Sequence, residues 1–399
     1  MYLEGESTQT MTISTDATLS PITGFIEPIE KITRKSHSSW EIIIDQLPEL
    51  LANFTFRTVM EDMAILSVTE LTINELKRAY VILTMFTNAY LWGYHTIDSV
   101  IHTIPSSISI PLLECCKILK MMPISTYATV CIWNVKKRVD NVYNLDTMEC
   151  MNTYTRTQDE SHFFLVSSAI DAYGHTTIPK IEKLIHSFSV MAIEDIQSTL
   201  LSINKDIQHM TSLLTRMGEK CDPSIFYNVV RHYQKGSLHA EGCLFEGYYE
   251  IDDHWKELCT LREGGLFFKL HGGSAAQSPI IHLIDSFLGI EHHPTGKIGV
   301  NFIPLMRSYM YYKHREYLNA SELQSVSFRD FVIKNGLQVE FNELIASVKV
   351  FRDTHFQMVA RYIINQSGRQ AIGTGGTQLV KFLKQSRDET KQSMLDTYK

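Results

Sequence analysis

The sequence lacks the features that would assign its 399 residues to several common classes of protein. Its seven cysteines follow no regular spacing, and neither CxxC nor CxxCH occurs, so zinc ribbons, thioredoxin-like sites and covalently attached haem are not indicated. An odd number of scattered cysteines is typical of a reducing, cytoplasmic location. The chain does not open on a basic segment followed by an apolar core, so we expect no secretory signal.

Clustered positive charge and long apolar runs are scarce as well. The net charge is −7, the pI is near 6.1 and the longest basic run is residues 136–138, which predicts no nucleic-acid partner and no anionic membrane partner. Only residues 79–97 lack Asp, Glu, Lys and Arg over the length of a membrane span. Because that stretch contains Asn88, Gly93 and His95, we predict a buried helix rather than a membrane helix.

Helical periodicity dominates what is present. Apolar residues recur at steps of three and four from Ile193 to Met217 and from Phe341 to Ile364, which is the pattern of long amphipathic helices. Shorter helices are predicted over residues 40–52, 74–92, 112–121, 125–135, 163–173 and 378–394. The predicted fold class is therefore all-α.

Composition divides the chain into unequal parts. The first 20 residues, rich in Thr and Ser, predict a flexible N-terminus. A polar run over residues 141–161 marks the boundary between a smaller, mainly helical domain (21–150) and a large all-helical domain (151–399), joined by a long linker. No internal repeat is present, and we expect a monomer.

A glycine-rich connection over residues 235–278 carries the only strand-like segments. Residues 245–251 and 266–270 are short and apolar, and they predict a small hairpin or no sheet at all. Long connections of this kind are usually functional lids or linkers.

His355 lies on the apolar face of the second long helix, four residues after Phe351 and four before Val359. A lone histidine on such a face is ordinarily a packing residue. However, residues 351–359 (FRDTHFQMV), followed by the loop 373–377 (GTGGT), closely resemble the haem-ligand helix and the C-terminal loop of the indoleamine 2,3-dioxygenases.

Four further segments resemble the same family and occur in its order. They are residues 125–129 (STYAT), 161–167 (SHFFLVS), 226–233 (FYNVVRHY) and 271–278 (HGGSAAQS). Each motif alone is weak, but the five in order, within residues 106–395, together indicate this family. The resemblance implies a large helical haem-binding domain, with the smaller N-terminal domain covering the distal pocket.

The resemblance implies one haem b per chain. His355 would be the only protein ligand of the iron, which leaves the opposite face open for O2. Gly273 and Ser274 would lie beside the haem, Arg352 would pair with a propionate, and Asp285 would lie on the proximal side. For Arg352 and Asp285, a surface salt bridge elsewhere is the alternative.

The same resemblance assigns a pocket for an indole. Phe163 and Ser167 are four residues apart, so one helix presents a ring and a hydroxyl to the same space. The resemblance makes Phe163 part of the substrate pocket and Ser167 a catalytic residue. Phe226, Ser274 and Ala275 would complete the pocket wall.

Polar residues of the family pattern would hold the amino-acid part of the substrate. The resemblance gives Arg231 both a binding and a catalytic role, because its forked guanidinium suits a carboxylate. Thr374 lies in the glycine-rich loop 373–377, which we expect to be mobile, and would meet the polar head of the substrate. The spacing from Tyr127 to the next tryptophan is shorter than in better-known members, so Tyr127, Ala128 and Thr129 all remain candidates for the pocket wall.

The implied activity is that of an oxidoreductase that inserts both atoms of O2 across the indole C2–C3 bond of L-tryptophan to give N-formylkynurenine. This is the first step of the kynurenine route of tryptophan breakdown and NAD biosynthesis, and it needs an electron donor that keeps the iron ferrous. Two alternatives remain: a haem protein of this fold that only binds or senses O2, and a helical scaffold without haem. His292, His293 and His314 lack metal-site spacing and are expected to face solvent.

Overall fold

The computed structural model describes residues 19, 23–93, 101–138, 140, 143–295, 301–367, 372–374 and 378–397. Helices make up most of this part of the chain, and one small sheet accompanies them, so the predicted mainly helical fold is confirmed. The predicted flexible N-terminus lies outside the described residues, apart from Leu19.

The regular helices vary from one turn to thirty residues. They are α1 (Ser38–Asp45), α2 (Leu47–Ala52), α3 (Phe56–Asp62), α4 (Ile73–Trp92), α5 (Ser106–Leu119), α6 (Gln158–Ser187), α7 (Ile193–Thr215), α8 (Pro223–Asn228), α9 (Pro279–Leu288), α10 (Phe302–Arg307), α11 (Tyr312–Lys334), α12 (Gln338–Val359), α13 (Asn365–Ser367) and α14 (Leu379–Gln392). Short 3₁₀ or π turns that matter below are η3 (Ala128–Ile132), η6 (Val230–Gln234), η8 (Ala275–Gln277) and η9 (Ala360–Ile364).

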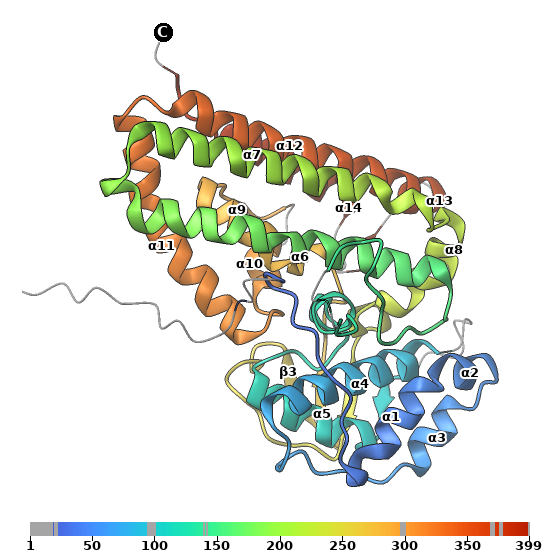
Figure 1. Cartoon of the computed structure of the whole chain (residues 1–399). Helices are drawn as coiled ribbons and strands as arrows, with labels where there is room; N and C mark the ends of the chain where they lie inside the picture. Colours follow the sequence, from blue (N-terminus) through green and yellow to red (C-terminus); the bar gives the residue numbers. More distant parts are fainter. Residues whose placement is uncertain are drawn as a thin grey trace, which may run out of the picture.

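Figure 1 shows the longest helices gathered on one side of the molecule and α1–α5 on the other. α7 packs along α12, α6 packs along α7, and α14 packs on α12. α11 packs on α9. The division of the chain into domains at 21–150 and 151–399 stays a prediction.

Both long amphipathic helices form as predicted. α7 buries the expected seam, which consists of Ile196, Leu200, Ile203, Ile207, Met210 and Leu214. α12 begins at Gln338, slightly before the predicted start, and its chain continues through the π turn η9 to Ile364. Single π turns in helices often accompany functional sites. His355 lies in the regular part of α12, just before this turn.

Three shorter predicted helices differ in extent. The helix predicted over residues 112–121 is α5, which begins at Ser106 and ends at Leu119. Residues 40–52 form two helices, α1 and α2, and Pro48 lies in the first turn of the second. Residues 163–173 belong to the much longer α6, whose N-terminus is capped by the Thr157 hydroxyl.

The helix predicted over residues 125–135 is wrong, because only the π turn η3 forms there. The backbone N–H of Ser125 donates to Asn88 Oδ1 at 3.0 Å, and that of Thr126 donates to the Thr129 hydroxyl at 3.1 Å. Both bonds fix the two residues that precede η3 in a non-helical conformation.

A four-stranded sheet in the order β1-β2-β4-β3 joins distant parts of the chain. Its strands are β1 (Thr103–Ile104), β2 (Cys243–Glu246), β3 (Cys259–Arg262) and β4 (Gly265–Phe268). The two predicted segments contribute β2 and β4, which pair antiparallel, but the hairpin is formed by β4 with β3, a strand that was not predicted. β1 pairs with β2 in parallel, so the glycine-rich connection packs against the N-terminal helices instead of forming a free linker.

Gly236 and Gly272 let two segments pass in close contact. A Cβ on Gly236 would lie 2.2 Å from the Leu270 backbone oxygen, and one on Gly272 would lie 2.1 Å from the Gln234 backbone oxygen. No side chain fits at either position. This contact brings the segment after Gly272 beside η6.

α4 is the buried helix predicted for residues 79–97, as far as that stretch is described. Every residue from Leu76 to Trp92 is buried. Among the helices that the structure describes, none combines the length and apolar character needed to cross a membrane.

Candidate functional site

One large cavity is lined by residues of α6, α7, α9, α12 and α14 together with η3, η6 and η8. It contains about 1960 Å³ of space that protein atoms do not fill, its opening to solvent included. Side chains from elements far apart in the sequence therefore face one common space.

Every residue predicted for the site lines this cavity. These residues are Tyr127, Phe163, Ser167, Phe226, Arg231, Gly273, Ser274, Ala275, Asp285, Arg352, His355 and Thr374. Their individual roles stay predictions. Among the three candidates left open near η3, the cavity is lined by Tyr127, whereas Thr129 bonds through its hydroxyl to Thr84 in the interior.

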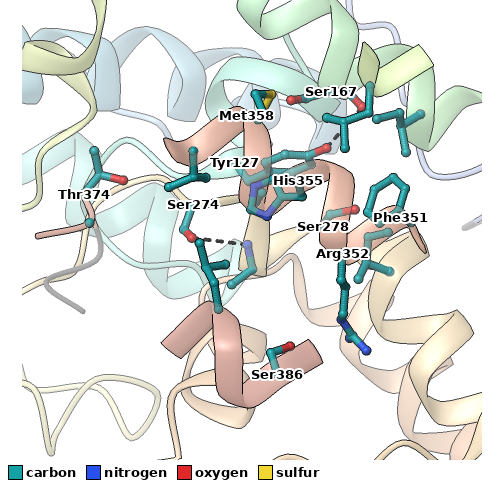
Figure 2. Close-up of a pocket in the computed structure, with 18 of the residues that line it drawn as sticks. Tyr127, Ser167, Ser274, Ser278, Phe351, Arg352, His355, Met358, Thr374 and Ser386 are labelled. Carbon is teal, nitrogen blue, oxygen red and sulfur yellow. Dashed lines mark hydrogen bonds between the residues drawn. The ribbon is translucent and has the colours of Figure 1, made fainter. Parts of the chain in front are cut away.

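His355 projects from α12 into the cavity, where Figure 2 shows its ring near the centre of the view with Arg352 and Met358 on either side. Burial, assisted by the positive charge of Arg352, lowers the pKa of His355 to about 4. The imidazole is therefore neutral at pH 7, which is the form that binds a metal. Within the described residues neither ring nitrogen has a hydrogen-bond partner, so both are available to a ligand.

Arg352 and Asp285 form an ion pair with each other at the cavity wall. Arg352 Nη2 lies 2.6 Å from Asp285 Oδ2, and the two side chains are only 12% and 9% exposed. The alternative of a surface salt bridge is thus wrong for both residues. Burial raises the pKa of Asp285, but Arg352 and His292 outweigh it and hold that pKa below its ordinary value.

Tyr127 is fixed by a carboxylate that the sequence did not reveal. Its hydroxyl donates to Asp171 Oδ2 on α6, and the Ser278 hydroxyl donates to the same oxygen at 3.0 Å. Asp171 is fully buried and lies behind the wall formed by the other two residues. Burial raises the pKa of Asp171 to about 6, although these hydrogen bonds oppose the shift.

Aromatic rings form one wall of the cavity. The centroids of Phe163 and Phe226 are 4.4 Å apart, and Phe226 meets Tyr362 edge to face at 5.7 Å. Phe163 and Ser167 lie one helical turn apart on α6 and both line the cavity, as their spacing predicted. Such a wall suits a flat apolar ring.

Arg231 is a buried cation without an anionic partner among the described residues. It is 9% exposed, and one guanidinium nitrogen donates to the Ile372 backbone oxygen. Its Nε is buried without a hydrogen-bond partner, and no carboxylate of the described residues forms an ion pair with it. Burial lowers the pKa of Arg231 from its ordinary value. An uncompensated buried charge is costly, so the site favours a ligand that brings a negative group.

Thr374 joins the C-terminal segment to the segment that follows Gly272. Its hydroxyl donates to the Gly273 backbone oxygen at 2.8 Å, and its own backbone oxygen accepts from the Gly272 N–H at 3.3 Å. Ser274 caps η8 by accepting from the Ala276 N–H. The rest of the predicted mobile loop, residues 375–377, lies outside the described residues.

The expectation that His292 and His314 face solvent is wrong. The His292 side chain is 5% exposed and that of His314 is 2% exposed, because each imidazole lies between or beside carboxylates in the interior. His293 does face solvent, with 67% of its side chain exposed. Sequence reasoning missed the two buried histidines because Glu389, which bonds to His292, and Glu27, which bonds to His314, lie far away along the chain.

The model of the indoleamine 2,3-dioxygenase family matches residues 14–393 of the chain. The chain is 30% identical to the indoleamine 2,3-dioxygenase of Saccharomyces cerevisiae over 437 aligned residues, which cover 93% of this chain and 91% of that protein. It is 29% identical to an indoleamine 2,3-dioxygenase of Aspergillus nanangensis, with 94% and 96% covered. It is also 28% identical to a 6-hydroxytryptophan 2,3-dioxygenase of Fusarium equiseti, with 94% and 96% covered.

Proposed function

The chain belongs to the indoleamine 2,3-dioxygenase family, and from this premise we propose that it uses haem and O2 to cleave the indole ring of L-tryptophan. Both oxygen atoms enter the product, N-formylkynurenine, and the reaction would feed tryptophan breakdown and NAD biosynthesis. The observation that carries the proposal is the convergence of all the family-like residues, from segments far apart in sequence, on one cavity. We place the protein in the cytoplasm, where its seven free cysteines would stay reduced.

The residues present fit a haem. The cavity is large and mainly apolar, and His355 offers a neutral imidazole without another partner. Arg352 has five N–H donors, so it can meet a propionate while it keeps its bond to Asp285. Gly273 and Ser274 add backbone and hydroxyl groups to the same wall. Bound haem would supply the iron that holds and activates O2, with an external electron donor keeping it ferrous.

The substrate half of the proposal rests on charge and shape. The Arg231 guanidinium, with its unpaired Nε, would hold the substrate carboxylate. Phe163 and Phe226 would pack against the indole ring, and Tyr127 would close the wall from the N-terminal part of the chain. Ala275 borders the same space. These contacts orient the ring and exclude water, which is how a protein assists chemistry that belongs to its cofactor.

Two hydroxyl groups remain close to the proposed substrate. Ser167 lines the cavity one turn after Phe163, and Thr374 borders it from the C-terminal segment. We assign Ser167 a position beside the indole ring and Thr374 a position beside the amino group. Neither is placed as a general base, because neither hydroxyl bonds to a carboxylate among the described residues.

An absorption titration of the purified full chain with haem tests this function. We expect one haem per chain and a spectrum of the ferrous protein that changes when L-tryptophan is added. Haem and O2 binding without any response to L-tryptophan or 6-hydroxytryptophan would instead support an oxygen-binding protein. Absence of stoichiometric haem would support a scaffold without haem.

A further inference from the structure

His292 lies between two buried carboxylates that belong to different helices. Its Nδ1 is 2.8 Å from Glu389 Oε2 on α14, and its Nε2 is 3.1 Å from Asp285 Oδ2 on α9. The His292 side chain is 5% exposed, and both acidic side chains are 9% exposed. The three groups therefore form one cluster away from bulk solvent.

This geometry favours a doubly protonated imidazole. Ionised carboxylate oxygens only accept hydrogen bonds, so each imidazole nitrogen that faces one has to donate. A neutral imidazole carries a single N–H. With that proton on Nδ1 it would donate to Glu389 and could accept from Arg352 Nη2, 3.4 Å from Nε2, but its Nε2 lone pair would also face Asp285 Oδ2 at 3.1 Å. The cation makes both hydrogen bonds and neutralises one of the two negative charges.

The second positive charge of the cluster comes from α12. Arg352 Nη2 donates to the same Asp285 oxygen at 2.6 Å, and another nitrogen of that guanidinium donates to the Thr390 hydroxyl on α14. Asp285 and Glu389 are thus balanced by His292 and Arg352. Asp285 and Arg352 line the cavity, whereas His292 and Glu389 lie behind them.

Other ionisable groups face His292 as well. His282, on α9, has its pKa lowered to about 4 by burial and is therefore neutral. His293 donates its backbone N–H to Glu389 and points its side chain to solvent. Burial and Arg352 lower the pKa of His292, but its bonds to Asp285 and Glu389 outweigh them and raise that pKa above its ordinary value.

We propose that His292 is a positioning residue: its positive charge ties Asp285 on α9 to Glu389 on α14 and so holds Arg352 and α14 in place at the cavity wall. When His292 loses its proton, one of these hydrogen bonds is lost and the cluster carries a net negative charge. α14 then loosens, and the cavity binds an anionic group at Arg352 less well. Only this last consequence rests on the proposed haem site.

The sign of the pH effect follows from linkage. A histidine with a raised pKa in the folded state stabilises that state fully below its unfolded pKa, near 6.5. The stabilisation is lost as pH rises through the higher folded value. The links from His292 to Asp285 and Glu389, which we call the clamp, should therefore hold at pH 6 and open as pH rises through the raised pKa of His292.

The first test needs no haem. We would follow the ring nitrogens of labelled histidines by NMR in the full chain, using His292→Gln to assign the His292 signals. The proposal expects both nitrogens of His292 to carry protons at pH 6.5. A neutral His292 ring at that pH would overturn it.

Hydrogen exchange over residues 379–392, corrected for intrinsic rates, gives the second readout. We expect strong protection of α14 at pH 6 and weaker protection at pH 9 in the parent chain, but weak protection at both values in His292→Gln. His186→Gln, at an exposed histidine on α6, is the control and should match the parent. Equal α14 protection in His292→Gln and the parent would overturn the proposal.

Glu389→Gln keeps an acceptor for His292 but removes the charge. This variant should retain α14 protection at pH 6 and lose it at a lower pH than the parent, a shift that a purely structural role would not produce. If His292→Gln fails to fold, this shift alone decides: an unchanged pH profile in Glu389→Gln overturns the proposal.

Haem loss to an acceptor protein tests the last step. It should be about 10-fold faster in His292→Gln, the lower end for outer partners of metal sites. The haem-free chain could show the expected protonation of His292 and the expected pH dependence of α14 protection while no variant binds haem. That result would contradict the proposed function but not the role of His292. An unchanged rate of haem loss would overturn the step through Arg352.

Discussion

Tyr127 and Asp171 are joined by a hydrogen bond behind the cavity wall, although one precedes the π turn η3 and the other lies on α6. The Ser278 hydroxyl and the Ile280 N–H also donate to Asp171, so the carboxylate ties two other segments to α6. No ion pair of Asp171 occurs among the described residues. The position of Tyr127 in the cavity thus depends on a buried acid held only by neutral donors.

The first prediction concerns this acid and pH. The folded pKa of Asp171 is about 6, against an ordinary value of 3.8. Between these values the folded chain keeps a proton that the unfolded chain has lost, so the Asp171 contribution to the free energy of unfolding falls as pH rises from 3.8 to 6. The fall is about 3 kcal/mol at 1.36 kcal/mol per pKa unit.

Denaturant unfolding of the full chain at a series of pH values measures this effect. The difference between the parent and Asp171→Asn should change across that window and level off above it. Tyr127→Phe, which removes one donor, should extend the change to higher pH. A parent-minus-variant difference that stays constant from pH 4 to 6 would contradict the assigned pKa.

The second prediction concerns Glu27, whose contribution to the free energy of unfolding changes with pH in the direction opposite to that of Asp171. Its carboxylate pairs with Lys77 on α4 and with His314 Nε2 on α11 at 3.1 Å. Burial raises the pKa of Glu27, but His314 and Lys77 outweigh it and lower that pKa to about 2. The stabilisation is present above pH 4.5 and is lost as pH falls toward 2.

Glu27→Gln should therefore lower the free energy of unfolding at pH 7 by about 3 kcal/mol. Glu30→Gln is the matched control, because Glu30 lies on the same segment with its side chain 72% exposed, and it should change nothing measurable. Equal stability of the two variants would show that the Glu27 cluster does not tie the N-terminal segment to α4 and α11.

The third prediction separates an enzyme from an oxygen carrier. Truncating one partner of a buried charge pair costs roughly 2–5 kcal/mol, so Arg231→Ala should lose about 30-fold or more in kcat/KM for L-tryptophan. Haem content should stay normal, because Arg231 and His355 lie on different elements. Steady-state kinetics with tryptamine, which lacks the carboxylate, should show a much smaller loss. An equal loss for both substrates would count against the carboxylate role.

The fourth prediction is that His355→Ala no longer binds haem through a histidine. His282→Gln is a demanding control, since His282 is also buried, neutral and part of the cavity lining. Its Nε2 is already bonded to the Ala276 backbone oxygen at 2.8 Å, whereas His355 has no such partner among the described residues. Absorption spectra should show a histidine-ligated haem in the control and not in His355→Ala; a normal Soret band in the latter would remove His355 as the ligand.

The local pattern predicted the long helices and the content of the cavity wall. α7 and α12 follow a regular apolar spacing, and the short motifs supplied the residues that converge on the cavity. The pattern failed for α11, because Ser321 and Ser325 occupy buried positions and bond back to the preceding turn. When small polar residues occupy buried positions, the apolar spacing is interrupted and does not indicate the helix.

The charged partners inside the molecule could not be predicted from spacing at all. Asp171 stands alone in an apolar stretch of α6, and only the fold brings Tyr127 and Ser278 to it. His292 likewise depends on Glu389, almost one hundred residues later in the chain. Pairings of this kind depend on how distant elements pack, which periodicity within one helix does not encode.

Product analysis with isotopically labelled dioxygen tests the central claim most directly. The reduced, haem-loaded full chain would be mixed with L-tryptophan and ¹⁸O₂, and the product would be examined by mass spectrometry. We predict N-formylkynurenine that carries two ¹⁸O atoms. Full haem loading and O2 binding with unchanged L-tryptophan, or a product with only one labelled atom, would contradict the account.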